Sequence, residues 1–174
     1  MYETEAELSA LQELLDASLA RAGQRLLAAW EAGSAMNAKQ VAGFRGVRLV
    51  AVASVNSKEE PRVAPRPAAF LHGKFYLAAN SRSTTVHRLI VDPSVAVTYF
   101  ENHILLMGHG KASFLRKGNA AFGAVAPEWK RAFNGGRYAL EGIDLFIRID
   151  ASHLQAFAQH PERYPGAWDR LPRS

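Results

Sequence analysis

The sequence predicts an α+β domain, mainly β, in which six strands form one antiparallel barrel. Six segments rich in β-branched and aromatic residues are separated by short polar turns, as in an antiparallel sheet. The 174 residues, 48% of them apolar, are enough to bury a single core without crosslinks. The chain holds no cysteine, which excludes disulfide scaffolds, cysteine-bound metals and thiol catalysis.

Residues 4–33 are predicted to form one long helix ahead of the barrel. Thr4 and Glu7 fit a capping box at its start, and Gly33 fits a helix stop. An apolar stripe follows this segment at steps of three and four residues: Leu8, Leu11, Leu15, Ala22, Leu26 and Trp30. We expect the stripe to pack on the barrel or on a partner subunit.

The six strands are predicted at residues 47–55, 62–70, 74–79, 94–100, 104–115 and 143–149. The last of them alternates cleanly between apolar and polar residues, whereas the first alternates only in part. Pro65 and Pro67 lie in the second strand. Because proline cannot donate to a strand ladder, they place this strand at a sheet edge or beside a ligand.

Three shorter helical segments are predicted between and after the strands. The segment 80–91 begins with hydroxylated residues and becomes a short amphipathic helix. Residues 120–133 form a helix with a break at Pro127, where a second helix can start. A helix of one or two turns is expected from Ser152. With no repeat or linker visible, the chain divides into a helical extension at 1–40, a barrel domain at 41–160 and a tail at 161–174.

The net charge of +5 is unevenly distributed along the chain. Residues 1–33 carry six acids and two bases, so the remaining residues carry 19 bases against 10 acids. A basic body favours anionic partners such as phosphate groups, nucleotides or acidic metabolites. A nucleic-acid binder is one alternative, but a recognition motif is missing. The acidic N-terminus and short apolar runs indicate neither a secretory signal nor a membrane span, so we expect a soluble cytoplasmic protein.

Arg62 and Arg66 are four residues apart on a predicted strand, so their side chains share one face. The next strand leads into residues 80–85, which bring hydroxyl groups to the start of a helix. Hydroxyls, free backbone N–H groups and the helix dipole at such a point can hold an anion, on which the two arginines could close. In the alternative interpretation, Ser83 or Thr84 only caps the helix and the arginines are solvated.

A set of ordered segments carries a resemblance to a known family: residues 47–55, 61–65, 74–79, 81–89, 92–97 and 107–112. Their order and spacing over about residues 45–150 resemble the pyridoxamine 5′-phosphate oxidase-like, flavin-binding split-barrel superfamily. The resemblance implies a Greek-key split barrel and a homodimer with a cofactor cleft at each subunit interface. It also implies an oxidoreductase that transfers hydride to or from a small organic substrate. FMN and the deazaflavin coenzyme F-420 both fit as its cofactor.

The resemblance extends to the family's phosphate site. Arg62 falls where the family has an arginine on the second strand, and Ala79 and Asn80 fall at the end of the third. Ser83 matches the serine of the family's Ser-x-Lys pattern. Thr85 stands where that pattern has its lysine, so the lysine's positive charge is missing.

Three arginines could replace this charge: Arg66, Arg82 and Arg88. The cofactor-binding residues that the resemblance implies are Arg62, Val63, Ala64, Pro65, Arg66, Ala79, Asn80, Ser81, Arg82, Ser83, Thr84, Thr85 and Arg88. The sequence does not identify a catalytic residue, and in cofactor-based redox chemistry the cofactor ring performs the hard step.

Two departures from the family limit the functional prediction. The C-terminal residues 168–174 lack the Arg-x-His pair of true pyridoxamine 5′-phosphate oxidases, which argues against that activity. Some relatives bind haem, and His103 or His109 could serve as a ligand, although no histidine or acid cluster has metal-ligand spacing. A module that binds a flavin or haem without turnover is therefore the alternative function.

Overall fold

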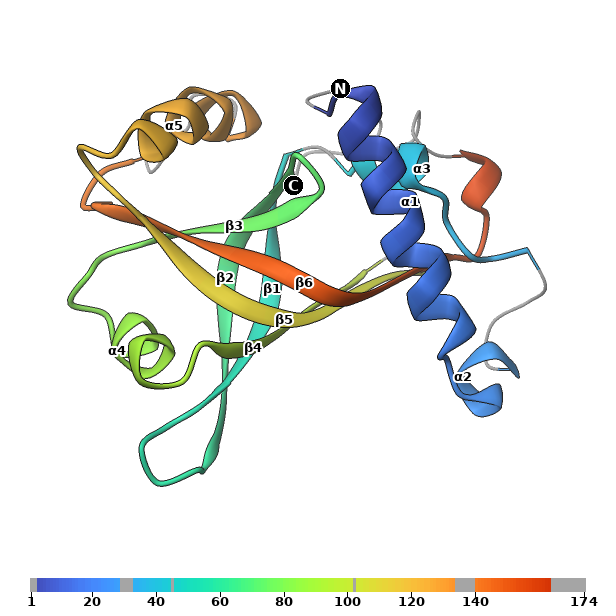
Figure 1. The fold of residues 1–174 in the computed structure, drawn as a ribbon, viewed down its shortest axis with the longest axis horizontal. Helices are drawn as coiled ribbons and strands as arrows, with labels where there is room; N and C mark the ends of the chain where they lie inside the picture. The colour runs from blue at the N-terminus through green and yellow to red at the C-terminus, as the bar shows by residue number, and fades with distance from the viewer. Residues whose placement is uncertain (1–2, 29–32, 45, 102, 134–139, 164–174) are drawn as a thin grey trace.

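Six antiparallel strands form a closed barrel in the order β1-β2-β3-β6-β5-β4 (Figure 1). The structure is a computed structural model, and it describes residues 3–28, 33–44, 46–101, 103–133 and 140–163. The strands are β1 (Val47–Val55), β2 (Pro61–Leu71), β3 (Lys74–Ala79), β4 (Ser94–Glu101), β5 (Ile104–Arg116) and β6 (Leu145–Ala158). The predicted fold class, a mainly β domain with a six-stranded barrel, is confirmed.

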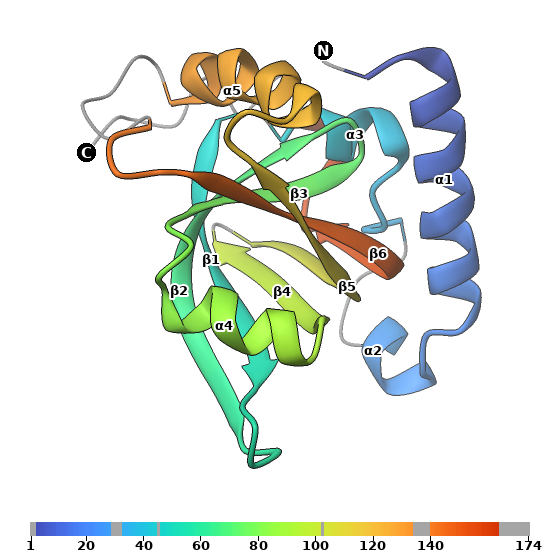
Figure 2. The same ribbon diagram turned by 60° about the vertical axis from the view of Figure 1, so that its left-hand side comes forward.

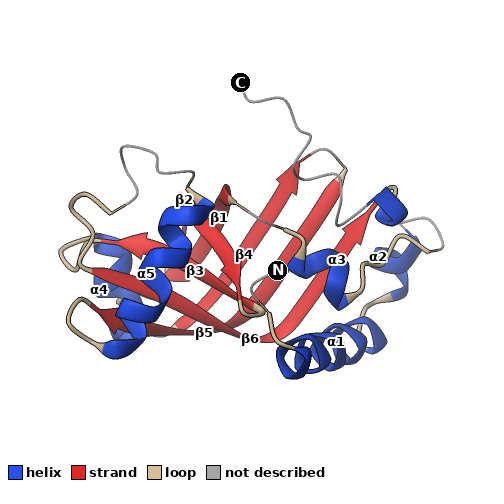
Figure 3. Cartoon of the chain, turned by 90° about the horizontal axis from the view of Figure 1, so that it is seen from above, coloured by secondary structure: helices blue, strands red, loops and turns tan. Residues whose placement is uncertain are grey.

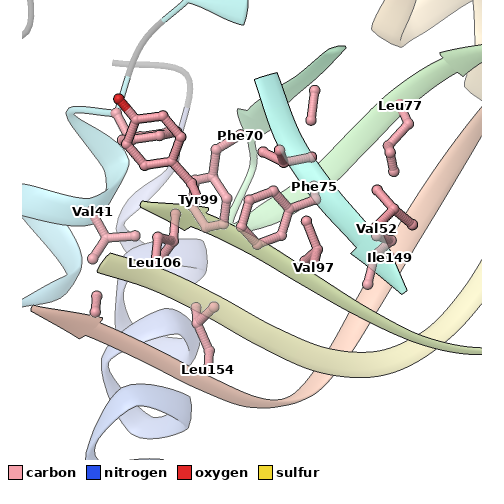
Figure 4. Close-up of a cluster of buried hydrophobic side chains, with 14 of the residues drawn as sticks. Val41, Val52, Phe70, Phe75, Leu77, Val97, Tyr99, Leu106, Ile149 and Leu154 are labelled. Carbon is pink, nitrogen blue, oxygen red and sulfur yellow. The ribbon is translucent and has the colours of Figure 1, made fainter. Parts of the chain in front are cut away.

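The inside of the barrel is filled by side chains that alternate along the strands. Val52, Phe75 and Val97 reach it from three strands and are almost fully buried (Figure 4). Gly108 on β5 faces the same interior, and Leu154 from β6 occupies the space beside it. A side chain at position 108 would crowd these neighbours, so the glycine permits close packing of the core.

The helices lie at the two ends of the barrel (Figure 3). They are α1 (Glu5–Ala20), α2 (Gln24–Ala28), α3 (Ala38–Ala42), α4 (Thr84–Val91) and α5 (Ala120–Ala132), with a 3₁₀ turn at Pro161–Arg163. In Figures 1 and 3, α1 to α3 lie toward one end, and α4 and α5 lie toward the other. Within the described residues, no helix is long and apolar enough to cross a membrane.

The prediction of one helix over residues 4–33 is wrong, because the chain turns at residues 21–23 and starts α2 at Gln24. The predicted capping box of Thr4 and Glu7 is present. Leu8, Leu11 and Leu15 of the stripe are buried under α1, but α2 buries no residue. The packing that stabilises a helix therefore ends with α1, and Gly23 adds a weak helix former at the break. Trp30 lies outside the described residues.

The helix predicted from Ser152 is also wrong, because β6 continues through this segment to Ala158. Residues 153–158 pair with β5 along its N-terminal half. Both faces of this part of β6 are covered, by the barrel interior and by α1, and residues 154–158 are all buried. A strand buried on both faces loses its polar–apolar alternation, which is why the sequence pattern was misleading.

The break predicted at Pro127 is absent, because α5 runs through it as one helix. Phe122, Val125 and Trp129 lie on the same side of α5 and pack on Phe146 in a second cluster outside the barrel. This packing flanks the proline on both sides. It stabilises a helix that loses one backbone hydrogen bond at Pro127.

Within the closed barrel, β2 and β3 pair over only a short stretch. Only the last four residues of β2, from Ala68 to Leu71, pair with β3, whereas residues 61–69 all pair with β1. Prolines stand at positions 61, 65 and 67, which are an even number of residues apart. Their backbone nitrogens therefore point to the same side of β2, and no N–H is lost from the pairing with β1 if that side is the one facing away from β1. β2 is therefore not an edge strand as a whole, but residues 61–67, which contain these prolines, have a partner strand on one side only. The β1–β2 hairpin extends beyond the other strands (Figure 2).

Candidate functional site

The start of α4 presents unpaired backbone donors beside β2. Ser83 is the N-cap, and its hydroxyl accepts a hydrogen bond from the N–H of Val86. The N–H groups of Thr84 and Thr85 donate to no described residue. The positive end of the helix dipole adds to these donors, so the position favours an anion.

Arg66 reaches this helix start from β2. The Arg66 side chain lies on the inner face of β2, because Arg66 pairs with Val50 on β1 and Val50 is buried. Its Nη2 donates a hydrogen bond of 2.7 Å to Oγ1 of Thr85, which is itself buried. No other described residue accepts a hydrogen bond from Arg66, so the rest of its guanidinium donors are available. The structure therefore joins Arg66 and Thr85, two of the predicted site residues.

Asp144 fixes the loop that leads into α4. Its carboxylate accepts hydrogen bonds from the N–H of Ser81, at 2.7 Å, and from the Ser81 hydroxyl. The hydrogen bond from the Ser81 side chain lowers the pKa of Asp144. Asn80 donates from its amide to the carbonyl of Gly142. Because Ser81 and Asn80 are held in this way, they position the loop, and the hydroxyl of Ser81 has an internal partner.

The sequence analysis did not find Asp144. It stands directly before the last strand, where an aspartate has no distinctive spacing. Its N–H donates to the carbonyl of Ala79, a buried residue at the end of β3, so the ends of β3 and β6 meet here. Only the pairing of these two strands could have revealed its role.

Arg62 lies four residues before Arg66, about 13 Å away along an extended strand. The register confirms that the two share a face, because they pair with Ser54 and Val50, both buried. Arg62 is half exposed and forms an ion pair of 2.6 Å with Glu60. A contact between Arg62 and a cofactor phosphate therefore stays a prediction, and Arg66 is the arginine that the structure brings to α4.

The other predicted site residues lie around the contact between Arg66 and the start of α4, and they differ in how far they are exposed. Arg88 donates at 3.3 Å to the hydroxyl of Thr84, one turn earlier in α4, and Arg82 is exposed. Ala64 shares the inward face of β2 with Arg66, whereas Val63 and Pro65 point outward and are exposed. Arg66 and Arg82 thus lie near the start of α4, and Arg88 reaches Thr84 from the last turn of the helix.

His103 and His109, the possible haem ligands, are not at this contact. His109 stands on β5 and stacks on His153 of β6, with ring centroids 5.6 Å apart. Burial, together with the neighbouring imidazole, lowers the pKa of His153. His103 lies in the tight turn between β4 and β5, with a positive φ. In the described ranges, no group of three histidines or acids could hold a metal ion.

The outward face of β2, β1, β4 and β5 is apolar and exposed. Leu49, Val63 and Phe100 each expose more than two thirds of their surface. Neighbouring outward side chains on this face are small or apolar. One row across the four strands, for example, consists of Pro65, Ala51, Thr98 and Met107. Large exposed apolar faces of this kind are typical of protein–protein interfaces.

Comparison with known proteins identifies the fold. No protein-family model matches the sequence, and no curated protein matches it. A conserved hypothetical protein of Mycobacterium tuberculosis is similar in structure, with a TM-score of 0.64 and 16% identity over 83% of this chain and 94% of that one. An F-420 reductase gives a TM-score of 0.52 at 13% identity, over 66% of this chain and 94% of that one.

The haem storage protein HutZ of Vibrio cholerae is similar too, with a TM-score of 0.54 at 17% identity, over 64% of this chain and 89% of that one. Identities this low show a shared fold. The chain shares the barrel fold of these proteins, which agrees with the fold that the sequence resemblance implies. Two of these proteins carry a cofactor in their names: one is an F-420 reductase, and the other is a haem storage protein.

Proposed function

We propose that the chain binds a phosphate-bearing flavin-type cofactor, FMN or the deazaflavin F-420, at the corner of Arg66 and α4. The observation that carries this proposal is the hydrogen bond between Arg66 and Thr85. It brings a guanidinium to a helix start whose first two N–H groups donate to no residue in the described part of the chain. A phosphate would accept from both sets of donors, and charge-assisted bonds of this kind are the strong ones.

The residues present fit the phosphate despite the missing lysine. Thr85 brings a hydroxyl but no charge to the position where the resemblance implies a lysine, and Arg66 supplies the charge from the neighbouring strand. Arg82 and Arg88 add positive potential nearby. Ser83 serves as the helix cap, so its role is to keep the N–H groups of Thr84 and Thr85 directed toward the ligand.

The proposed activity is hydride transfer to or from a small organic molecule. The cofactor ring supplies the hydride chemistry when it is bound, and the chain's own residues bind the phosphate, orient the cofactor and exclude water. Around Arg66 and Thr85, the described residues provide binding groups and no evident acid–base catalyst.

The functional unit that we propose is a homodimer in which the apolar face of β2, β1, β4 and β5 is covered by a second copy. A second copy has the same apolar face and is a matching occupant under two-fold symmetry. The inward face of β2 carries Arg66, and its outward face carries Val63 and Pro65. The proposed cofactor cleft therefore borders the proposed subunit interface.

A titration of the purified chain with FMN and with F-420, followed by fluorescence, tests the binding proposal. Saturable binding of either cofactor with micromolar affinity supports it, and the absence of binding of both contradicts it. Storage of a flavin or haem without turnover is the second candidate function, suggested by the fold shared with a haem storage protein. Reduction of the bound cofactor by a nicotinamide at catalytic rates, or its reoxidation by an organic acceptor, eliminates that candidate.

A further inference from the structure

A groove of about 760 Å³ lies between α1 and α5, away from Arg66 and the start of α4. Its floor is the outer face of β3, β5 and β6, and its walls are the facing sides of the two helices. Figures 1 and 2 show the β2–β3 turn, residues 72 and 73, between these helices. The volume falls within the usual range of small-molecule sites.

The walls of the groove are mostly apolar and lined by small side chains, but Glu7 of α1 and Glu128 of α5 also line the groove. Ala10 of α1 and Ala121 and Ala124 of α5 are exposed along it, and Leu14 adds a larger apolar surface. Any of these alanines, replaced by a large residue, would fill part of the space. The groove is thus kept open by side-chain size, and it offers contacts to an apolar body.

The floor of the groove carries an excess of positive charge and of hydrogen-bond donors. Asp150 accepts hydrogen bonds from Lys74 at 2.6 Å, from Arg148 at 2.9 and 3.1 Å, and from Ser113 at 3.0 Å. Burial opposes ionisation of Asp150, but these partners outweigh it and lower its pKa, so one negative charge faces two positive ones. The second Nη of Arg148 donates to no described residue.

Tyr76 adds a neutral donor to the same floor. Its ring is buried in the cluster under α5, while its hydroxyl makes no hydrogen bond to the described part of the chain. Burial raises the pKa of Tyr76, so the phenol keeps its proton. A buried aromatic residue with an unused hydroxyl facing a cavity is a natural partner for an acceptor group.

One end of the groove is braced by His72, which has a positive φ in the β2–β3 turn. Its Nε2 lies 2.7 Å from a carboxylate oxygen of Glu128 on α5, and its Nδ1 lies 3.2 Å from that of Glu7 on α1. The ring therefore links the two helices through a strand turn and sets their separation. The groove is preformed, which lowers the cost of ordering it around a ligand.

We propose that this groove is a second ligand site, which takes a small organic molecule with an apolar body and one carboxylate. The alanine and leucine walls hold the body. The carboxylate accepts from Arg148, Tyr76 and Lys74 on the floor, while Glu7 and Glu128 are both paired with His72 at the β2–β3 turn. This site uses β3, β5, β6, α1 and α5, so its existence does not depend on the proposed cofactor corner.

Isothermal titration of the full chain with 2-naphthoate and with neutral 2-naphthamide tests this site. We expect saturable 1:1 binding of 2-naphthoate and binding of the amide at least about tenfold weaker, the effect of losing a charge-assisted contact. Arg148→Met should weaken the binding of 2-naphthoate about ten- to hundredfold, while Arg66→Met, at the cofactor corner, should leave it unchanged. No binding of 2-naphthoate, or equal binding of acid and amide, overturns the proposal.

Ala124→Trp supplies an independent test that leaves the charges in place. The indole would occupy the groove, so we expect loss of 2-naphthoate binding with an unchanged thermal midpoint. Ser9→Trp puts the same side chain on an exposed position of α1 that does not line the groove, and it should bind like the unmodified chain. Undiminished binding in the Ala124→Trp variant shows that the ligand lies elsewhere.

Discussion

The guanidinium of Arg66 donates a hydrogen bond to the hydroxyl of Thr85, with 2.7 Å between Nη2 and Oγ1. This contact joins β2 to the start of α4. It places a positive charge beside the position where the family resemblance implies a lysine. The charge comes from a strand instead of from the helix itself, and this difference underlies the proposed binding of a cofactor phosphate.

The proposed homodimer predicts that charges on the apolar sheet face separate the subunits. Phe100→Lys or Leu49→Lys would place an ammonium in the centre of the interface without a partner, so we expect each variant to be a folded monomer. Sedimentation velocity measures this change. Val91→Lys is the matched control, since Val91 is equally exposed but lies on α4. A dimeric Phe100→Lys variant, or a chain that is monomeric without substitution, contradicts the proposed interface.

The His72 brace predicts a pH-dependent stability. Burial lowers the pKa of His72, but the hydrogen bonds and charges of Glu128 and Glu7 outweigh it and raise the pKa overall. A raised pKa in the folded state means that the contribution to stability is complete below the unfolded value of about 6.5 and is lost as pH rises through the folded value. Asparagine tolerates a positive φ, so His72→Asn removes the charge with little backbone strain.

We therefore expect the difference in thermal midpoint between the unmodified chain and His72→Asn to be largest at about pH 6. It should shrink steadily toward pH 9. Thermal unfolding across this range checks the sign. A difference that grows with pH would show that neutral His72 is the form that the fold prefers.

The irregularity of the β5–β6 ladder predicts a site that requires glycine. A side-chain carbon at Gly110 would collide with the carbonyl oxygen of Asp150 and with the Cα of Ala151, next to the register shift at His109 and Gly110. Since both obstacles are backbone atoms, Gly110→Ala should lower the free energy of unfolding by at least about 2 kcal/mol.

Gly123→Ala is the matched control on α5, where a side-chain carbon meets no atom. Because alanine is the better helix former, this variant should be more stable by about 0.5–1 kcal/mol. Urea unfolding measures both changes. Equal stabilities of Gly110→Ala and the unmodified chain would mean that the strands can shift register at no cost.

The sequence predicted the strands well where one face is buried and the other exposed. The limits of β1 and β3 are those expected, and the prolines of β2 lie in the part of the strand that has a partner on one side only. The second half of β6 was missed because α1 covers its outer face, so that Leu154, Ala156 and Phe157 form a continuous buried run. This cover is a tertiary contact between residues more than 130 positions apart, and no local pattern contains it.

Part of the candidate site could likewise be predicted. The family resemblance placed Thr85 at the position of the missing lysine, and Arg66, Arg82 and Arg88 were each predicted as a possible replacement for its charge. The choice among the three depends on the approach of β2 to α4, which only the folded barrel defines. Asp144 holds the loop only because β3 pairs with β6, and this pairing could not be predicted from the sequence.

The predicted role of Arg62 remains to be tested. Its alignment with the family's arginine predicts that Arg62→Ala weakens cofactor binding, whereas Lys58→Ala, in the turn of the same hairpin, does not. In the structure Arg62 is paired with Glu60. A phosphate contact would therefore require that this exposed pair open. Fluorescence titrations of both variants decide the point, and equal affinities of Arg62→Ala and the unmodified chain exclude the contact.

We propose above all that Arg66 holds a cofactor phosphate at the start of α4. Titration of the Arg66→Met variant with FMN and F-420 tests this proposal most directly. Loss of a charge-assisted contact costs about 1.5–3 kcal/mol, which is roughly a ten- to hundredfold loss of affinity. We predict that loss for whichever cofactor the unmodified chain binds, with an unchanged thermal midpoint. The same affinity in Arg66→Met and in the unmodified chain would place the phosphate elsewhere and contradict the account.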